Sequence, residues 1–574
     1  MMGIRIRRSH RWEPWLVGAS LAPLIVMYLA FMGLPIAWTV IRSFTGPQGT
    51  GLGNYLEMFR SPFLLQSFRN SIWVSAWSAA IGTALALPSA MAIRRSPKRE
   101  AFTVFCNTVN NFSGVPLAFA FIVIMGTQGA ITILLRRHLG LELDIYSSTG
   151  LMILYVYFQV PLGILSIYPA LDVLGRDLLE ASRTLGASDG RFWLKVGFPL
   201  LLPTVSGTGC LLFANAMGAY ATAYALNTNS NLVPIRISSL VAGDVFLDFD
   251  LACAMSTALL AITLSVTFLG MRARVRSQGS SPGGNLLDIS NPRWSAPVLL
   301  GTLAFLLLPV LSTVLHSLSS SWGATVLPDG LSLRWYRELI GDPRFRWAVL
   351  RSVGVSALSV GLASAVLLPP MVLSRCFYPR LYRGIERASI VPLVVPPVVT
   401  SVGLLILYSP TPIGGTIWLL TPVYSVMCVP FVARGISSAL EGMNLREIME
   451  AALSFGMGPL KALVQVVLPN IKGGLASGAL MGFSVLMGEF VLGNLLVGTR
   501  FETLQIYLFS KRGAGGHLAS AMVTVHFLVC GTLSAMAWWS LKGSRSGIRD
   551  REIESAGCGG KVRQLIRRWR HAAY

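Results

Sequence analysis

The chain is organised around a polar segment at residues 180–199, which has the sequence EASRTLGASDGRFWLKVGFP. A second segment at residues 450–469, EAALSFGMGPLKALVQVVLP, repeats this plan without a gap. Both begin with an acid and small residues, carry a glycine six positions later and end in a proline before a long apolar run. Small residues admit a partner's backbone, a glycine lets a short helix end, and a proline fits the first turn of the next helix. Each segment is therefore predicted to form a helix, a bend and a second helix that enters an apolar span.

Composition bounds the class of protein independently. Of the 574 residues, 53% are hydrophobic and 13% are charged, and the mean hydropathy is +0.62. These values predict an all-α, polytopic membrane protein rather than a set of soluble domains. The net charge of +22 does not indicate a nucleic-acid partner, because the basic residues form short runs beside apolar segments. The positive-inside rule and the anionic headgroups of the lipid bilayer account for such runs.

Apolar runs predict about twelve transmembrane helices in two similar halves of six helices each. The first half, residues 1–276, has predicted spans at 14–41, 71–93, 112–135, 151–171, 200–226 and 251–271. Residues 277–293 are rich in Gly, Ser and Pro and are predicted to form a flexible linker. The second half, residues 294–541, has a predicted span at 296–318, then one that aligns with 71–93 at an offset of 281, and further spans at 388–408, 416–438, 471–497 and 518–541. The halves also share single residues: Tyr55, Ser71, Ser75 and Pro88 recur 281 positions later as Tyr336, Ser352, Ser356 and Pro369.

Basic residues orient the spans. Arginines precede the first span, and basic clusters follow the second span at 94–99 and the sixth at 272–276. The positive-inside rule makes these places cytoplasmic, so both termini and both polar segments are predicted to lie inside the cell. The loop at 320–351 departs from the rule, because it is assigned outside and holds five arginines.

The C-terminal tail, residues 542–574, is basic. Val562, Leu565, Ile566 and Trp569 recur at helical spacing between lysine and arginine. This pattern fits a basic amphipathic helix on the inner leaflet, and the glycine-rich stretch just before it fits a disordered tail instead.

The two polar segments resemble the EAA loops of permease subunits of bacterial type I ABC importers. That pattern is Glu-Ala-Ala, three residues, Gly, nine residues, Ile, one residue and Leu-Pro. The second copy follows it closely, and the first has conservative replacements. The matching residues are Glu450, Ala451, Ala452, Gly456, Val466, Leu468 and Pro469 in the second copy, and Glu180, Ala181, Ser182, Gly186, Val196, Phe198 and Pro199 in the first.

This resemblance covers nearly the whole chain and implies the rest of the assembly. The two loops would be coupling helices that dock two ATP-binding cassette ATPase subunits, and those subunits would bind ATP and Mg²⁺. An extracytoplasmic solute-binding protein and a location in the bacterial inner membrane are implied in the same way. The chain looks most like fused, two-in-one permeases related to polyamine, ferric-iron, thiamine and aminoethylphosphonate importers. Residues 215–226 and 487–508 look most like the polyamine-type branch.

Sequence motifs for catalysis or cofactor binding are missing. The chain has no GxxxxGK[ST] phosphate-binding loop, no HExxH or similar histidine spacing, no nucleophile elbow and no CxxC pair. We therefore predict that it binds no cofactor or metal and is not an enzyme, so that ATP hydrolysis comes from a partner.

Four polar residues inside apolar runs are candidates for the translocation path: Asn215, Tyr220, Glu489 and Asn494. An acid in a spanning helix is normally turned inward or paired. Glu489 is thus either a gating or cation-sensing group near the outer mouth, or an acid satisfied by nearby polar groups or water. The asparagines either line the path or hold helices together.

An alternative function stays open at this point. Two six-helix halves also describe an ion-coupled secondary transporter. Such a protein is expected to carry several intramembrane charges, whereas here Glu489 is the candidate, and the paired polar segments would have no role. A membrane enzyme would need a cluster of acids, histidines or cysteines that the sequence lacks.

Overall fold

The computed structural model describes residues 13–46, 49–174, 176–226, 230–242, 247–275, 294–322, 328, 330–441, 443–512 and 516–540. These residues are almost entirely helical, apart from a short hairpin of β1 (Thr45–Gly46) and β2 (Gly49–Thr50) and one isolated bridge between Ser319 and Leu331. The predicted linker at 277–293 and the tail at 542–574 lie outside the described residues.

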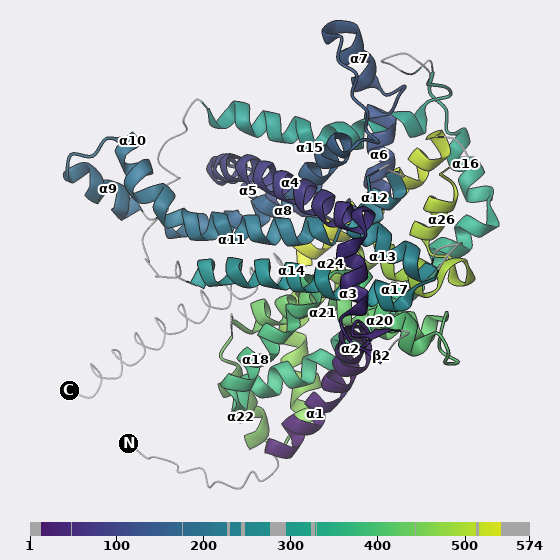
Figure 1. Cartoon of the computed structure of the whole chain (residues 1–574). Coiled ribbons are helices and arrows are strands. Elements are labelled where there is room, and N and C mark those ends of the chain that lie inside the picture. Colours follow the sequence, from purple (N-terminus) through teal and green to yellow (C-terminus); the bar gives the residue numbers. More distant parts are fainter. Residues whose placement is uncertain are drawn as a thin grey trace.

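The helices repeat in the two halves (Figure 1). The first half contains α1 (Glu13–Tyr28), α2 (Leu34–Arg42), α3 (Gly53–Arg60), α4 (Pro62–Arg95), α5 (Arg99–Asn110), α6 (Val115–Met125), α7 (Ala130–Leu139), α8 (Ser148–Ile167), α9 (Arg176–Thr184), α10 (Asp189–Phe192), α11 (Phe198–Met217), α12 (Ala221–Leu226), α13 (Val233–Ala242) and α14 (Phe249–Val275). The second contains α15 (Ser295–Leu318), α16 (Arg334–Gly341), α17 (Pro343–Phe377), α18 (Pro379–Ser389), α19 (Val391–Val394), α20 (Pro397–Tyr408), α21 (Ile417–Glu441), α22 (Leu445–Ser454), α23 (Pro459–Ala462), α24 (Leu468–Met487), α25 (Val491–Leu496), α26 (Leu504–Ser510) and a helix at Gly516–Ser540.

Ten helices of the described residues are long and apolar enough to cross a membrane, and they coincide with ten of the predicted spans. The span predicted at 388–408 is a pair of helices, Pro379–Val394 and Pro397–Tyr408, that meet at 91°. The span predicted at 471–497 is interrupted at Gly488, between α24 and α25. Asn470 and Lys472 lower the hydropathy of α24, although its position in the fold matches that of α11.

The two longest helices, α4 and α17, contain 34 and 35 residues. A span needs about 20 residues, so at ~1.5 Å per residue both helices extend beyond the hydrocarbon core. Each begins with a proline in its first turn behind a capping side chain: Ser61 accepts from the Leu64 N–H, and Asp342 accepts from the Arg344 N–H. The sequence prediction placed the start of α4 nine residues too late, because Gln66, Ser67, Arg69 and Asn70 interrupt the hydropathy after the apolar first turn.

Residues that repeat in the sequence make the same contacts in the two halves. The Tyr55 hydroxyl lies 2.8 Å from Ser43 Oγ, and the Tyr336 hydroxyl lies 2.7 Å from Ser317 Oγ. In the same way, Ser71 Oγ accepts from the Val233 N–H at 2.9 Å, and Ser352 Oγ accepts from the Leu504 N–H at 2.7 Å. The repeat is therefore structural as well as sequential.

The first helix of each half packs against the other half. The α1 helix contacts α17 and α2 contacts α20, while α15 lies along α4 and α6 (Figure 1). Hydrogen bonds hold these crossings: the Tyr157 hydroxyl donates to the Leu306 carbonyl at 2.7 Å, and the Tyr408 hydroxyl donates to the Ala30 carbonyl at 2.9 Å. Each half thus contributes its first helices to the packing of the other half.

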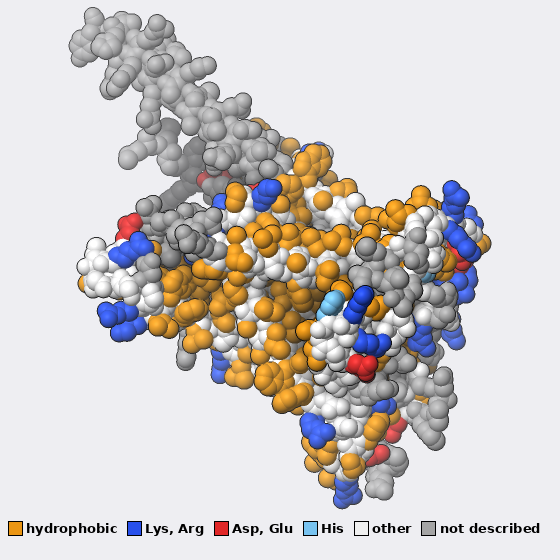
Figure 2. Space-filling view, turned by 90° about the horizontal axis from the view of Figure 1, so that it is seen from above, with side chains coloured by type: hydrophobic (Ala, Val, Ile, Leu, Met, Phe, Trp, Pro, Cys, Tyr) orange, Lys and Arg blue, Asp and Glu red, His pale blue; other side chains and the backbone are white. Residues whose placement is uncertain are grey.

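The distribution of side chains on the surface also fits a membrane protein. Apolar side chains cover a broad central belt, and lysine and arginine gather toward the ends of the molecule (Figure 2). Such a belt suits the hydrocarbon core of a bilayer, with basic side chains reaching its headgroups.

Candidate coupling loops and translocation path

The first polar segment has the predicted helix, bend and helix. The α9 helix ends at Thr184, and Gly186 adopts φ = +78°. The Gly186 N–H donates to the Arg183 carbonyl at 2.9 Å, and the Ala187 N–H donates to the Ser182 carbonyl at 3.0 Å. These two bonds form a Schellman motif, which ends a helix at a residue with positive φ, usually glycine.

The second polar segment has the same geometry. The α22 helix ends at Ser454, and Gly456 also adopts φ = +78°. The Gly456 N–H donates to the Leu453 carbonyl at 3.0 Å, and the Met457 N–H donates to the Ala452 carbonyl at 3.2 Å. The glycine of each motif is thus required by the backbone of the bend.

The chain then enters the membrane in the same manner in both halves. The short helices α10 and α23 continue through π-helical segments, η3 (Trp193–Gly197) and η5 (Leu463–Val467), into α11 and α24. Pro199 and Pro469 lie in the first turns of these long helices, where a missing N–H costs nothing. Both loops lie at the same side of the molecule: Figure 1 shows α9 and α10 beyond the left-hand end of α11 and α22 at the lower left, with α7 and α16 on the opposite side.

The acids and small residues at the start of each motif differ in burial. Glu180, Ala181, Glu450 and Ala451 are exposed, whereas Ser182 is half-buried and Ala452 is buried. Glu450 pairs with Arg446 one turn earlier at 2.8 Å. An exposed ion pair of this kind contributes little to stability, so the acid remains accessible to a partner.

Sequence reasoning missed a second shared feature of the loops. Leu185 and Phe455 directly precede the two glycines, and their side chains are 87% and 86% exposed. Leu194 and Val464, which also correspond to each other, are exposed as well. The two polar loops thus share bulky apolar side chains at matched exposed positions. The repeat of Leu-Gly as Phe-Gly was the available signal.

Glu489 lies in the break between α24 and α25. Its carboxyl group accepts hydrogen bonds from the Tyr424 hydroxyl at 2.9 Å, the Leu492 N–H at 2.9 Å and the Gly493 N–H at 3.2 Å. The residue is only 8% exposed. Of the two interpretations offered by the sequence, the acid satisfied by nearby polar groups describes this state; a gating role stays a prediction.

The first half has the same break without the acid. Tyr155, the counterpart of Tyr424, donates to the Ala219 carbonyl at 2.8 Å. Ala219 occupies the position that corresponds to Glu489, twenty residues after the loop proline. The fused chain therefore has one carboxyl group at its centre instead of a symmetric pair.

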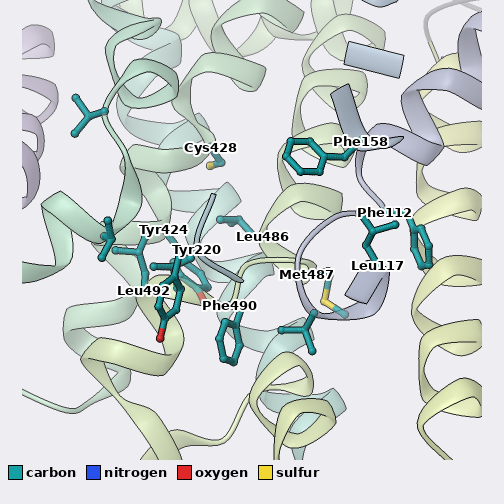
Figure 3. Packing of buried hydrophobic residues seen from close by; sticks show 14 of the residues in the cluster. Phe112, Leu117, Phe158, Tyr220, Tyr424, Cys428, Leu486, Met487, Phe490 and Leu492 are labelled. Carbon is teal, nitrogen blue, oxygen red and sulfur yellow. The ribbon is translucent and has the colours of Figure 1, made fainter. Parts of the chain in front are cut away.

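Four aromatic rings from the two halves meet beside these breaks, and we call them the aromatic cluster: Tyr220, Tyr224, Phe490 and Phe509. Tyr220 and Phe490 hold corresponding positions, and their ring centroids lie 6.3 Å apart in a stacked arrangement. Tyr224 stacks on Phe509 at 4.9 Å, and Phe490 contacts Phe509 at 5.2 Å. Tyr220 and Phe490 are both 1% exposed, and Figure 3 shows them side by side near Tyr424. The cluster therefore packs the two halves against each other beside the helix breaks.

The structure brings two of the predicted path residues together and leaves a third apart. The Tyr220 hydroxyl lies 2.9 Å from Ser238 Oγ and also interacts with the Asn494 side chain. Asn494 in turn lines a cavity of about 340 Å³, together with Ser409, Gly415 and Arg500. Asn215 is exposed on α11 and has no side-chain hydrogen bond to the described part of the chain.

The described residues contain no group of three or more His, Cys, Asp or Glu side chains that could hold a metal ion. Together, the two repeated halves, their apolar helices and the paired polar loops describe a polytopic membrane protein built from two similar units.

Comparison with known proteins identifies the family. Residues 80–322 and 354–538 match the binding-protein-dependent transport system inner membrane component family, so the chain belongs to this family and carries its domain twice. It is a permease component of an ABC importer.

Several relatives are named transport permeases. The probable ABC transporter permease protein y4fN of Sinorhizobium fredii (strain NBRC 101917 / NGR234) is 26% identical over 78% of this chain and 82% of that protein. The putrescine transport system permease protein PotI of Escherichia coli (strain K12) is 31% identical over 46% of this chain and 97% of that protein. The thiamine transport system permease protein ThiP of the same strain is 23% identical over 88% of this chain and 93% of that protein. These relatives are permeases rather than enzymes.

Proposed function

We propose that this chain supplies both halves of the translocation path of an ATP-driven importer in the bacterial inner membrane, with both termini in the cytoplasm. Two separate ATPase subunits dock under residues 180–199 and 450–469, and an extracytoplasmic binding protein delivers the solute. The observation that carries the proposal is the pair of coupling loops, which share φ = +78° at their glycines and an exposed apolar side chain before each glycine.

The coupling loops are suited to receive force. Each is a rigid bend, fixed by two backbone hydrogen bonds, at the foot of a long helix that reaches the centre of the molecule. A push on α9 or α22 is therefore transmitted along α11 or α24 to the breaks that hold Tyr220 and Phe490. Separation of these rings opens the path outward, and their contact closes it, which makes transport a ligand-driven shift between two states.

A polyamine-type solute is the cargo favoured by this centre, with ferric iron, thiamine and aminoethylphosphonate as the other candidates. The aromatic faces of Tyr220, Tyr224 and Phe490 attract organic cations once the rings separate. Glu489 adds a carboxyl group next to Phe490. The similarity to a putrescine permease supports the same cargo.

The coupling proposal is tested by Leu185→Asp and Phe455→Asp. Each change places a charge in the proposed contact and removes an apolar side chain whose burial is worth about 1.5–3 kcal/mol. We expect each variant to lose co-purifying ATPase subunits and ATP-dependent uptake while still inserting. Leu139→Asp changes an exposed leucine on the opposite side of the molecule and is the matched control. We expect this variant to retain the ATPase subunits and ATP-dependent uptake.

The solute is identified by uptake into proteoliposomes that hold the full chain with its ATPase subunits and binding protein. Uptake of radiolabelled putrescine, thiamine and ferric iron is compared with and without ATP on the side of the membrane that holds the ATPase subunits. Uptake of putrescine that requires ATP supports the proposal. Uptake by the isolated chain that follows an ion gradient and ignores ATP would assign it to the secondary transporters instead.

A further inference from the structure

The outer side of the second half carries a group of exposed arginines, which we call the basic face. Its members lie on α16, the first turn of α17, the short helix η6 (Gly498–Phe501) and the end of α26: Arg334, Arg337, Arg346, Arg500 and Arg512. None of them forms a salt bridge with an acid in the described part of the chain. Figure 2 shows lysine and arginine gathered at the right-hand end, the side on which Figure 1 places α16.

Glu338 is the exposed acid of α16, so the two arginines of this helix exceed its acids by one. Two other acids of this region, Asp342 and Glu502, are engaged inside the protein. Asp342 accepts from the Tyr507 hydroxyl at 2.6 Å and lies 3.4 Å from Lys511 Nζ. Burial alone would raise the pKa of Asp342, but the hydrogen bonds from Tyr507 and the Arg344 N–H and the charge of Lys511 lower it. Glu502 is buried and accepts from Arg344 at 2.8 Å. These carboxylates therefore do not neutralise the basic face.

The first half lacks this face, although it has the same fold. The α3 helix corresponds to α16, and Tyr55 and Glu57 correspond to Tyr336 and Glu338. The arginines, however, are replaced: Gly53, Leu56 and Leu65 stand where the second half has Arg334, Arg337 and Arg346. The corresponding helices of the two halves thus differ in charge, and Arg334, Arg337 and Arg346 are three of the five arginines by which the 320–351 loop departs from the positive-inside rule.

The basic face borders the cavity that Asn494 lines. Arg500 lines this cavity of about 340 Å³ together with Asn494, which interacts with Tyr220 of the aromatic cluster. A protein that docks on the basic face therefore lies over the outer end of the path.

We propose that the basic face is the docking surface for an acidic lobe of the extracytoplasmic binding protein, and that this charge fixes which lobe sits on which half. This inference rests on the proposed function. A binding protein has to meet a two-fold repeated surface in one orientation, and charge complementarity at the rim of an interface chiefly sets orientation and association rate. The counterpart on α3, where Glu57 balances Arg60, receives the other lobe.

The test uses the full chain with its ATPase subunits in nanodiscs and the binding protein that restores uptake in the assay above. Association is measured for the native chain, for Arg334→Glu/Arg337→Glu and for Arg60→Glu/Arg69→Glu. The second pair changes the same charge at exposed residues on the outer side of the first half and is the matched control. If Arg334→Glu/Arg337→Glu does not fold, Arg334→Gln/Arg337→Gln, which neutralises the two charges, is measured in its place.

We expect the second-half reversal to slow association about tenfold or more at low salt. The difference should shrink at about 1 M salt, where the screening length falls to about 3 Å. The first-half reversal should change association less than threefold. Equal effects of both reversals, or no effect of the second-half reversal, overturn the inference; the latter result would assign the arginines to lipid headgroups. Uptake that needs no binding protein would instead overturn the proposed function.

Discussion

Replacing Gly456 by alanine perturbs one backbone conformation and little else. Gly456 has φ = +78°, and a Cβ atom built on it meets no atom within 4 Å. The whole cost is therefore conformational, because an L-residue in the left-handed region is disfavoured by roughly 1–2 kcal/mol. This energy lowers the population of the intact bend by a factor of about 5–30.

The assay compares Gly456→Asn, Gly456→Ala and Gly456→Val in the full complex. Asparagine tolerates the left-handed region and a β-branched residue tolerates it least. We expect ATP-dependent uptake to fall in the order Gly, Asn, Ala, Val, and amide exchange in residues 445–462 to rise in the same order. Gly458→Ala is the matched control, since it lies in the same loop with equally open surroundings but has an ordinary φ of −69°.

Two results would refute this reasoning. If Gly456→Ala and Gly458→Ala lowered uptake equally, the loop would be sensitive to any added side chain and the conformation would not be the cause. If Gly456→Val transported normally, the bend would have no part in coupling.

Three further predictions concern the aromatic cluster, the Glu489 site and the start of α17. Tyr424→Phe removes a donor to the Glu489 carboxyl group and should destabilise the protein by about 1.5–3 kcal/mol. Tyr155→Phe should cost only about 1 kcal/mol, because the native Tyr155 hydroxyl donates to a neutral carbonyl. Thermal unfolding in detergent measures the two losses of stability, and equal losses would contradict the prediction. Phe490→Ala removes the ring that joins the two halves in the aromatic cluster, and it should destabilise the protein by about 3–5 kcal/mol. It should also raise the leak of solute across proteoliposomes in the absence of ATP. A variant that does not leak would show that other residues close the path. The pKa of Asp342 is lowered in the folded protein, so its contribution to stability is present above the unfolded pKa and is lost as pH falls through the folded pKa. Amide exchange in α26 should therefore rise in acid below pH ~4. In Asp342→Asn, which can still cap α17, amide exchange in α26 should already be raised at neutral pH and should lose its acid dependence.

The sequence determined the architecture of this protein. Long apolar runs permit few structures other than membrane helices, because an unpaired backbone group in lipid is costly. The recurrence of Tyr55 and Ser71 as Tyr336 and Ser352 showed two related halves before any contact was known. The glycines at 186 and 456 predicted the bends, since few other residues adopt positive φ without strain.

The tertiary structure decided which residues meet at the centre. Glu489 could be given no partner from sequence, because Tyr424 lies 65 positions away and reaches it only when α21 packs beside α24. The aromatic cluster joins Tyr220 to Phe490 across the two halves, and nothing local in the chain encodes that contact. Likewise, the basic face depends on Asp342 and Glu502 being taken up by internal partners. Hydropathy and turn propensity act over neighbouring residues, whereas these contacts arise from helices that pack after long loops have closed.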